Sequence, residues 1–388
     1  MKFLVIKKII IASRVGRFID SAIRFTLSFI PLLHSVVSQR NIPFKPDNFV
    51  FFLYGGIGDA ILIIPLINKL SLISQVTILC DRTIHNLSFI FPKNTTVIIY
   101  NKNNLNSHAA SYREQIVGSY PVFIQTSPVI EMYAVRVLLR IPYAFGLISS
   151  FRCIRSIGFR SKPLYISSHS RNFSFNEIYN KLSLLLEPKL DSNNNTSEQV
   201  YIDKSLYGNR IDEKYVVISS TKSAQWEMGK MPDYEYMNLA KYLVTKHGYK
   251  VLFVGHESEK EEINKMIADS SDSHMIENVA GRTSLKELAL IMQGAEFVVA
   301  NDNGVSHMSS FLGVKTLVLF MFSDPSVYEW NNNNYAYIFN KQHECMPCVG
   351  LNRFPQDNYP VLCKNQLLCN TTIDSFTVIK KLETLSWV

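Results

Sequence analysis

The clearest structural signal in the chain is the stretch Ala300-Asn301-Asp302-Asn303-Gly304-Val305-Ser306-His307. An apolar run, Glu296–Ala300, leads into it, an apolar helical pattern, Met308–Leu312, follows, and a strand-like run comes next at Thr316–Phe320. We interpret these segments as a strand, a glycine-bearing turn, a helix and a second strand. Such a turn lies at the amino end of a helix, where N–H groups and the helix dipole favour a phosphate. Ordinary loops have the same Asn, Asp and Gly composition, so the stretch alone leaves both interpretations open.

The composition is that of a folded, basic chain with room for two domains. Its 388 residues allow two domains of about 150 residues each. With 47% hydrophobic and 19% charged residues, the chain is not of the disordered class. The net charge of +8 fits an anionic partner, either a phosphorylated small molecule, an acidic membrane surface or nucleic acid. We expect no nucleic acid, because the sequence has no finger, arginine-rich tract or RNA-binding motif.

Residues 1–46 differ from the rest because basic and apolar side chains alternate along them. Their longest uncharged stretch, Phe25–Gln39, is shorter than the roughly 20 apolar residues that a spanning helix needs. Two interpretations stay open. The segment is either a basic amphipathic helix on an anionic bilayer or an extra helix packed on the following domain.

A second glycine-rich turn lies near the start of the first domain. The continuous apolar strand Asn48–Tyr54 runs directly into Gly55-Gly56-Ile57-Gly58-Asp59, and an apolar helix follows. Glycines at such a junction let a ligand approach the backbone closely, although the spacing is not that of a dinucleotide fingerprint. Asp59 is either a helix cap or a carboxylate that points into a cleft.

Strand and helix patterns alternate on both sides of a polar, Asn-rich segment at 188–212, which we interpret as a linker. The alternation predicts an α/β fold with mostly parallel sheets, in domains 47–187 and 213–372, followed by a C-terminal helix at 373–388. The other predicted strands are Val76–Cys80, Val97–Tyr100, Val122–Thr126, Tyr215–Ile218 and Lys250–Val254, and the predicted helices of the second half lie near 233–246, 260–268 and 284–293.

Polar clusters fall at the carboxyl ends of the predicted strands, and these ends share one edge of an open α/β sheet. The sequence therefore predicts one site in a cleft between the two domains. The clusters are Asp59, Ser219–Lys222, Glu257, Asp302–His307 and Asp324.

With these residues the chain resembles glycosyltransferase family 9, the lipopolysaccharide heptosyltransferases, over roughly residues 48–385. Gly58-Asp59 with Pro65-Leu66 resembles the amino-terminal motif of the family, and Asn278–Ala289 resembles its Asn-x-Ala-Gly-x-Thr helix start. Asn301–His307 and Asp324-Pro325 resemble its donor motif. The resemblance implies a GT-B-type fold, with two Rossmann-like domains whose parallel sheets face a central cleft. It also implies inverting sugar transfer, most commonly from ADP-heptose, with no required cofactor and no catalytic metal.

The resemblance also implies roles for individual residues. Asp59 would be the catalytic base, Glu257 would bind the ribose, and the amides after Gly304 would take phosphate oxygens. The alternative for His307 is a neutral core histidine, and the alternative for Glu257 is an acid that favours a helix start. The glycine loop is Gly55, Gly56 and Gly58, and the donor-binding set is Ser220, Thr221, Lys222, Lys230, Glu257, Asp302, Asn303, Gly304 and His307.

Three features depart from the family pattern. The family usually has Lys-x-Trp-Pro where this chain has Lys222 and then Lys230-Met231-Pro232, so either lysine is a candidate for the donor phosphates. Asn303 stands where the family usually has Ser or Thr. Residues 1–46 have no counterpart in its plain members. As in other GT-B folds, we expect the final helix to cross back onto the first domain.

Four late cysteines form a possible structural zinc site: Cys345, Cys348, Cys363 and Cys369. The Cys-x-x-Cys spacing favours zinc, but the second pair is spaced more widely than zinc ligands usually are. A redox pair or plain thiols in a loop are the alternatives.

Taken together, the sequence predicts a bacterial glycosyltransferase, cytoplasmic and peripheral on the inner membrane through its N-terminal helix. Its partners would be a nucleotide-sugar donor and a glycolipid acceptor of lipopolysaccharide or a related glycan. Two alternatives are another nucleotide sugar, used for O-antigen or capsule, and a non-catalytic nucleotide-sugar-binding protein.

Overall fold

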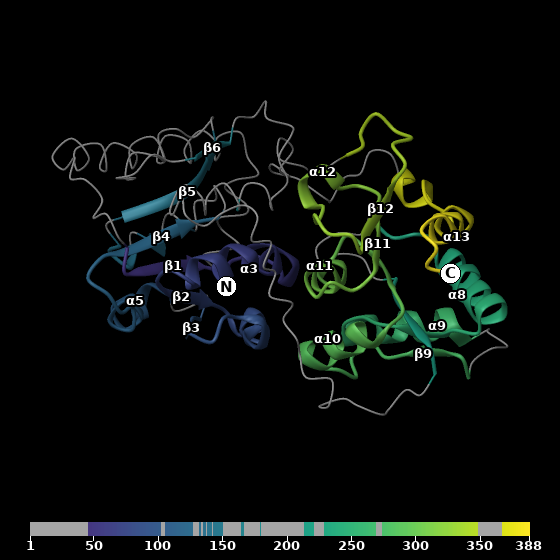
Figure 1. The fold of residues 1–388 in the computed structure, drawn as a ribbon, viewed down its shortest axis with the longest axis horizontal. Coiled ribbons are helices and arrows are strands. Elements are labelled where there is room, and N and C mark those ends of the chain that lie inside the picture. Colours follow the sequence, from purple (N-terminus) through teal and green to yellow (C-terminus); the bar gives the residue numbers. More distant parts are fainter. Residues whose placement is uncertain are drawn as a thin grey trace.

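The computed structural model describes residues 46–101, 105–126, 132, 135–136, 138–141, 143–149, 164–166, 179, 213–220, 229–268, 274–347 and 367–388. These residues form two parallel sheets with helices packed on them, one sheet in each half of the chain (Figure 1). The predicted N-terminal helix within 1–46, apart from residue 46, and the predicted linker 188–212 lie outside the described residues. Within the part of the chain that is described, no helix has the length and apolar character needed to cross a bilayer.

The first domain is a six-stranded parallel sheet in the order β3-β2-β1-β4-β5-β6. The continuous apolar run of β1 is explained by burial on both faces. Phe49 and Phe51 pack in the cluster that includes helix α3, whereas Val50 and Phe52 pack in a cluster on the other face. The strands are β1 Asn48–Phe52, β2 Gln75–Cys80, β3 Thr95–Ile99, β4 Pro121–Gln125, β5 Tyr143–Ser149 and β6 Leu164–Ile166, and the helices are α3 Ile57–Ser71, α4 Arg82–His85 and α5 Leu105–Glu114, with a 3-10 turn at Ser88–Ile90.

The second domain repeats this plan, with strand order β12-β11-β10-β7-β8-β9. Its strands are β7 Tyr215–Ser219, β8 Lys250–Phe253, β9 Ile276–Asn278, β10 Val298–Asn301, β11 Thr316–Phe320 and β12 Tyr335–Phe339. Its helices are α8 Asp233–His247, α9 Lys260–Ala268, α10 Leu285–Gly294, α11 Gly304–Phe311, α12 Pro325–Tyr328 and α13 Ser375–Thr384, with 3-10 turns at Glu257–Glu259 and Leu368–Thr371. The prediction of two Rossmann-like domains with parallel sheets is confirmed.

The strand order reverses at two places, between β1 and β4 in the first sheet and between β7 and β10 in the second. In doubly wound sheets, ligands bind where the order reverses, at the carboxyl ends of the strands. The Gly55–Asp59 turn follows β1, Ser220 follows β7, and the Asp302–His307 stretch follows β10. The sequence motifs therefore lie at the two positions where this architecture opens a binding crevice.

The two domains meet through helices α3 and α11, which pack against each other (Figure 1). Ile61 and Ile64 of α3 share one buried apolar cluster with Met308 and Phe311 of α11. Burying one such side chain contributes about 1.5–3 kcal/mol, so this cluster holds the domains together. The first turns of both helices consequently lie at the domain boundary.

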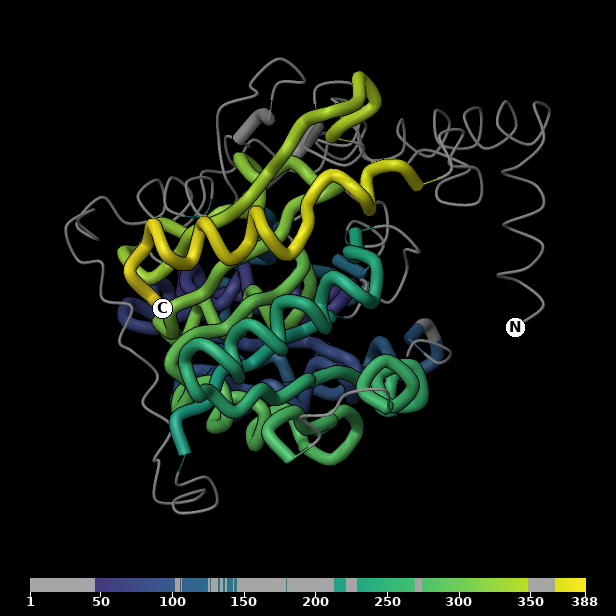
Figure 2. The backbone as a smooth tube through the Cα atoms, turned by 90° about the vertical axis from the view of Figure 1, so that its right-hand side faces the viewer, coloured from purple at the N-terminus to yellow at the C-terminus, as the bar shows by residue number. Residues whose placement is uncertain are grey.

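The final helix, α13, packs along α8 of its own domain (Figure 2). Its buried Val378 and Leu382 belong to the apolar cluster of the second sheet. The Ser375 amide donates to Glu235 Oε2 at 2.9 Å, and the Tyr242 hydroxyl donates to Glu383 Oε1 at 2.8 Å. The expectation that this helix crosses back onto the first domain is therefore wrong, because its apolar stripe is already buried against the second domain.

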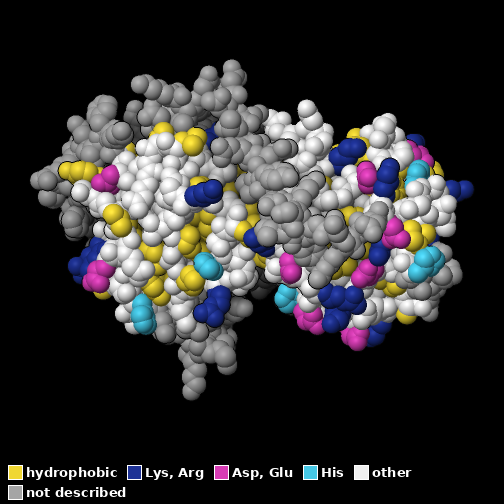
Figure 3. All heavy atoms as spheres, turned by 60° about the horizontal axis from the view of Figure 1, so that its bottom comes forward, with side chains coloured by type: hydrophobic (Ala, Val, Ile, Leu, Met, Phe, Trp, Pro, Cys, Tyr) yellow, Lys and Arg dark blue, Asp and Glu magenta, His cyan; other side chains and the backbone are white. Residues whose placement is uncertain are grey.

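Charged side chains of both signs lie side by side over the second domain (Figure 3). Several of them form ion pairs, such as Arg282 with Glu277 at 3.3 Å and Lys250 with Glu277 at 3.3 Å. Exposed pairs of this kind contribute little to stability, about 0–1 kcal/mol each. On the described part of this domain, much of the basic charge is balanced locally.

Candidate functional site

The turn after β1 places Asp59 at the domain boundary. Gly55 has a φ of +121°, and a Cβ at this position would lie 2.6 Å from Asp59 Oδ2, so only glycine fits. The Gly56 amide donates to Asp59 Oδ2 at 3.0 Å, which satisfies one of the free N–H groups at the start of α3. The carboxylate also lies within the electrostatic range of His307 and Asp302. Both interpretations of Asp59 hold, since it caps α3 and faces the second domain.

Asn303 caps the facing helix, α11. Its Oδ1 accepts from the Val305 amide at 2.9 Å and from the Ser306 amide at 3.3 Å. Its Nδ2 donates to Ser219 Oγ at 3.1 Å, across the point where the second sheet reverses its order. The Val305 and Ser306 amides already have an acceptor in this structure, and the expectation that the amides after Gly304 take phosphate oxygens stays a prediction.

His307 is held between two partners, and these fix its tautomer. The Trp330 indole N–H donates to His307 Nδ1 at 3.2 Å. An indole N–H can only donate, so Nδ1 carries the lone pair and the proton lies on Nε2. His307 Nε2 is 3.3 Å from Asp302 Oδ1, and Ser323 Oγ donates to the other oxygen, Oδ2. The side chain is buried, as the core-histidine alternative assumed, but it bridges a tryptophan and a carboxylate.

The first turns of α3 and α11 touch at Gly58. A Cβ at Gly58 would lie 2.8 Å from His307 Cδ2 and 3.7 Å from Gly304 Cα. Glycine is thus required for the two turns to approach this closely. The contact brings the predicted base, Asp59, into one site with the predicted donor residues Asp302, Asn303, Gly304 and His307.

The surroundings of this site shift the pKa of Asp59. Asp59 is solvent-accessible in this structure, but the protein atoms crowded around its carboxylate raise its pKa by desolvation, and the negative charge of Asp302 raises it further. The hydrogen bond from the Gly56 amide and the interaction with His307 oppose this rise without cancelling it. A carboxylate with a raised pKa is a stronger base, which suits proton abstraction near neutral pH.

The sequence patterns did not single out two tyrosines and a tryptophan that lie at the domain boundary. Tyr179 is buried, and burial together with the Asp59 charge raises its pKa. Burial together with the charges of Asp302 and Asp59 raises the pKa of Tyr328, so both phenols stay neutral. Tyr328 is the last residue of α12, and Trp330 lies two residues beyond it. Both rings lie 6.4 Å from the His307 ring although they are distant in the chain, so no spacing in the sequence marks them.

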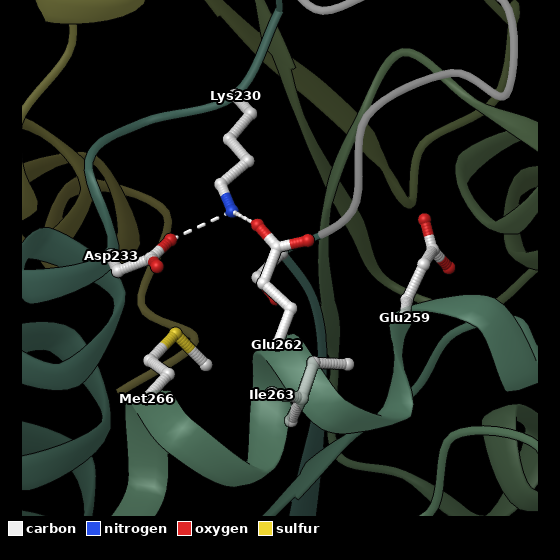
Figure 4. Close-up of a pocket in the computed structure, with 7 residues that line it drawn as sticks. Lys230, Asp233, Glu259, Glu262, Ile263 and Met266 are labelled. Atoms are coloured by element: carbon white, nitrogen blue, oxygen red, sulfur yellow. Dashed lines mark hydrogen bonds and ion pairs between the residues drawn. The ribbon is translucent and has the colours of Figure 1, made fainter.

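Lys230 lies in a separate pocket of the second domain, beside Ser220 at the end of β7 (Figure 4). Its Nζ is 2.7 Å from Asp233 Oδ1 and also forms an ion pair with Glu262. Burial lowers the pKa of Lys230, but the two carboxylates outweigh that effect and raise it. Two acids already neutralise this lysine, and which of the two lysines binds the donor phosphates stays a prediction. Lys222 and Thr221 lie outside the described residues.

Gly229 explains why the family lysine is missing from its usual place. Counted back from Pro232, the Lys-x-Trp-Pro pattern puts that lysine at position 229. Gly229 has a φ of +88°, and a Cβ there would lie 2.4 Å from a ring carbon of Phe322. No side chain fits at this position, so the departure from the family pattern is a real structural difference.

Glu257 begins a 3-10 turn at the carboxyl end of β8. Its Oε1 is 3.3 Å from Lys260 Nζ, and its side chain is largely exposed. Gly281, with a φ of +70°, packs so closely that a Cβ there would lie 2.8 Å from Glu257 Cα. This exposed carboxylate is placed beside the β7 crevice, and its role in ribose binding stays a prediction.

The possible structural zinc site at the late cysteines also stays a prediction. Cys345 and Cys369 are free thiols that pack in the core of the second domain, whereas Cys348 and Cys363 lie outside the described residues. The described residues contain no cluster of three or more potential metal ligands.

A family model described as glycosyltransferase family 9 (heptosyltransferase) matches residues 165–356. The chain belongs to glycosyltransferase family 9. Lipopolysaccharide heptosyltransferase 2 of Salmonella typhimurium is 30% identical over 98 residues, which are 25% of this chain and 28% of that relative. The matched segment thus spans little more than a quarter of the curated relative. The Gly55–Asp59 turn precedes the residues that the family model matches.

Similarity to solved structures extends over both domains. The family 9 glycosyltransferase from Veillonella parvula has a TM-score of 0.69 at 18% identity, covering 89% of this chain and 98% of the other. The E. coli ADP-heptose lipopolysaccharide heptosyltransferase II has a TM-score of 0.64 at 17% identity, covering 87% and 98%. At such identities the similarity establishes the fold, and the predicted GT-B type is confirmed.

The contact between Gly58 and His307 generates a prediction for this family 9 chain. Gly58→Ala puts a methyl group against the imidazole, and overpacking of this kind costs about 1–3 kcal/mol. We expect sugar transfer to fall roughly tenfold or more, since about 1.4 kcal/mol corresponds to a factor of ten. Gly56→Ala is the matched control, because its φ is −90° and its Cβ would meet nothing closer than 3.7 Å. Equal activity of the two variants in a transfer assay would contradict the proposed approach of the helices.

The same substitution at each of the two candidate lysines tests which of them binds the donor phosphates. We expect Lys222→Gln to raise the KM for the donor at least tenfold. Lys230→Gln should leave that KM within about twofold and cost only about 1 kcal/mol of stability, because its partners are half exposed. Steady-state kinetics and thermal unfolding measure both effects. A large rise in donor KM for Lys230→Gln alone would show that this lysine leaves its two acids to bind phosphate.

Proposed function

We propose that this chain is an inverting, metal-independent glycosyltransferase that moves heptose from ADP-heptose onto a lipopolysaccharide core or a related surface glycan. The observation that carries the proposal is the meeting of Asp59 with the Asp302–His307 pair at the α3–α11 boundary. One domain supplies a base and the other a donor-binding turn, as a transfer between two substrates requires. The name of the E. coli structure, an ADP-heptose heptosyltransferase, supports this choice of donor.

Asp59 would act as the general base. The Gly56 amide holds Oδ2, while Oδ1 has no recorded partner among the described residues. Oδ1 would take the proton of the acceptor hydroxyl as that oxygen attacks the anomeric carbon of the donor. The bond between this carbon and the diphosphate oxygen breaks on the opposite face, so the configuration inverts.

The second domain would hold the donor. Asp302 is an anion and would repel a diphosphate, so we assign its free lone pairs to hydroxyl groups of the sugar. Ser220 and Lys222, after β7, would face the diphosphate, and Lys222 would balance the charge that develops as it leaves. Glu257, after the neighbouring strand, would accept from the ribose hydroxyls.

The place of action is part of the proposal. A glycolipid acceptor lies in a membrane, and the basic segment 1–46 would bring the enzyme to the anionic cytoplasmic surface of the inner membrane. Two alternatives stay open for the function. The same fold could use another nucleotide sugar, or the chain could bind a nucleotide sugar without transferring it.

Binding calorimetry with ADP-heptose, ADP, UDP and GDP tests the donor. We expect the two adenine ligands alone to bind, and Asp302→Ala to weaken ADP-heptose more than ADP, because Asp302 is assigned to the sugar. Asp374→Ala is the control, since Asp374 caps α13 far from the boundary. Preference for UDP or GDP would overturn the donor, and binding without transfer to any glycan acceptor would favour the non-catalytic alternative.

Asp59→Asn tests the base. An amide cannot accept the proton, so we expect kcat to fall about 10²–10⁴-fold with donor affinity nearly unchanged. Asp374→Asn, the same change in another helix cap, should keep full activity. Full activity of Asp59→Asn would show that Asp59 is not the base.

The pH dependence adds a second test of Asp59. Because the pKa of Asp59 is raised, the active anion is lost as pH falls through a value above the ordinary 3.8. Asp302→Asn removes a negative charge that raises this pKa, so the acid limb of the pH–rate profile should move to lower pH. An acid limb that stays in place would contradict the electrostatic link between the two carboxylates.

A further inference from the structure

We infer that Trp330 is a positioning residue of the donor site, and that its indole N–H locks the His307 ring so that Nε2–H stays directed at Asp302. The inference rests on the proposed function, because it concerns how the donor carboxylate Asp302 is oriented. Trp330 lies in the segment between α12 and β12, outside every motif that the sequence singles out.

Packing against α11 places the Trp330 ring so that its indole nitrogen, the only polar atom of the side chain, lies near His307. The Trp330 ring makes an edge contact with Phe311, with centroids 6.1 Å apart, and lies 6.4 Å from the His307 ring. Both partners are on α11, four residues apart, so they lie on the same face of that helix. The apolar contact with Phe311 holds the indole, and the hydrogen bond of 3.2 Å then reaches His307 Nδ1.

The hydrogen bond decides between two orientations of the imidazole. In the observed orientation, Cδ2 faces Gly58, Nδ1 faces Trp330 and Nε2 faces Asp302. A half-turn of the ring about χ2 would exchange Nδ1 with Cδ2 and Nε2 with Cε1. A carbon would then face Asp302, and the indole N–H would lose its acceptor. The Trp330 N–H therefore selects the orientation in which Asp302 has a donor.

A fixed His307 in turn fixes Asp302. Ser323 Oγ donates to Asp302 Oδ2, and Asp302 Oδ1 lies 3.3 Å from His307 Nε2. Each oxygen of the carboxylate therefore has a neighbour that restricts it. The hydrogen bond from Ser323 on Oδ2 and the 3.3 Å approach of His307 Nε2 to Oδ1 act on different oxygens, so together they set the plane of the carboxylate and the direction of its free lone pairs. Those lone pairs would meet the sugar hydroxyls, so a rotated imidazole would misdirect them.

The test begins with Trp330→Phe, which keeps an aromatic ring against Phe311 and removes the N–H. A hydrogen bond of this kind corresponds to about a three- to tenfold effect, so we expect kcat/KM for the donor sugar to fall by that factor. Trp387→Phe is the matched control, because this tryptophan packs on Phe297 at 6.4 Å and is not recorded in contact with His307. It should leave the transfer rate unchanged.

A double-mutant cycle separates positioning from simple packing. If Trp330 acts through His307, Trp330→Phe should have no further effect on kcat/KM in the His307→Phe background. Nitrogen NMR of the His307 side chain gives a second readout. We expect one Nε2–H tautomer in the wild type and a mixture of tautomers in Trp330→Phe.

Three results would overturn the inference: unchanged kinetics of Trp330→Phe, additive effects in the cycle, or an unchanged tautomer in that variant. Failure of the proposed function looks different. In that case the wild type transfers no sugar to any acceptor, whereas the tautomer comparison still reports whether Trp330 locks His307.

Discussion

The structure depends on one close approach, that of the first turn of α3 to the first turn of α11. Gly58 has no side chain, and this allows the His307 ring to lie against the backbone of the other domain. Each turn follows a strand at which its sheet reverses order, so each domain brings its natural binding edge to the same place. Apolar residues behind the turns hold the helices together. The backbone architecture alone therefore places the site at the α3–α11 boundary, whichever side chains the two turns carry.

This approach creates an electrostatic problem, because Asp59 and Asp302 are both acids at one partly desolvated boundary. Helix starts favour negative charge, and the Gly56 amide and the Ser323 hydroxyl each donate to one of the two carboxylates. His307 Nε2 lies 3.3 Å from Asp302 Oδ1, and the Trp330 indole N–H occupies the other nitrogen of the ring. The negative charge of Asp302 helps to raise the pKa of Asp59. Asp59 and Asp302, the proposed base and the proposed donor carboxylate, are thus coupled across the boundary through space.

The sequence was most informative where local physics alone decides the structure. Buried apolar runs followed by glycine-containing or polar segments predicted β1, β7 and β10, and hence the position of the site. Residues whose roles come from distant segments were not predictable in this way. The partner of Lys230, Glu262, lies on another helix, and Trp330 reaches His307 through a chain reversal. Strands β5, β6, β9 and β12 were not predicted. The position of α13 was wrongly inferred from the resemblance, because the apolar stripe of this helix already packs on its own domain.

The departures from the family pattern share one consequence. Asn303 uses its own side chain to satisfy the Val305 and Ser306 amides, and Lys230 is neutralised by Asp233 and Glu262. Gly229 leaves no room for a side chain where the family carries its lysine. Two usual sources of positive potential for a diphosphate, free helix-start amides and that lysine, are thus reduced here. Under the proposed function a diphosphate still needs its charge balanced, and we assign that role to Lys222, in the segment after β7. Donor affinity in this chain should therefore depend on that segment more strongly than the family pattern alone implies.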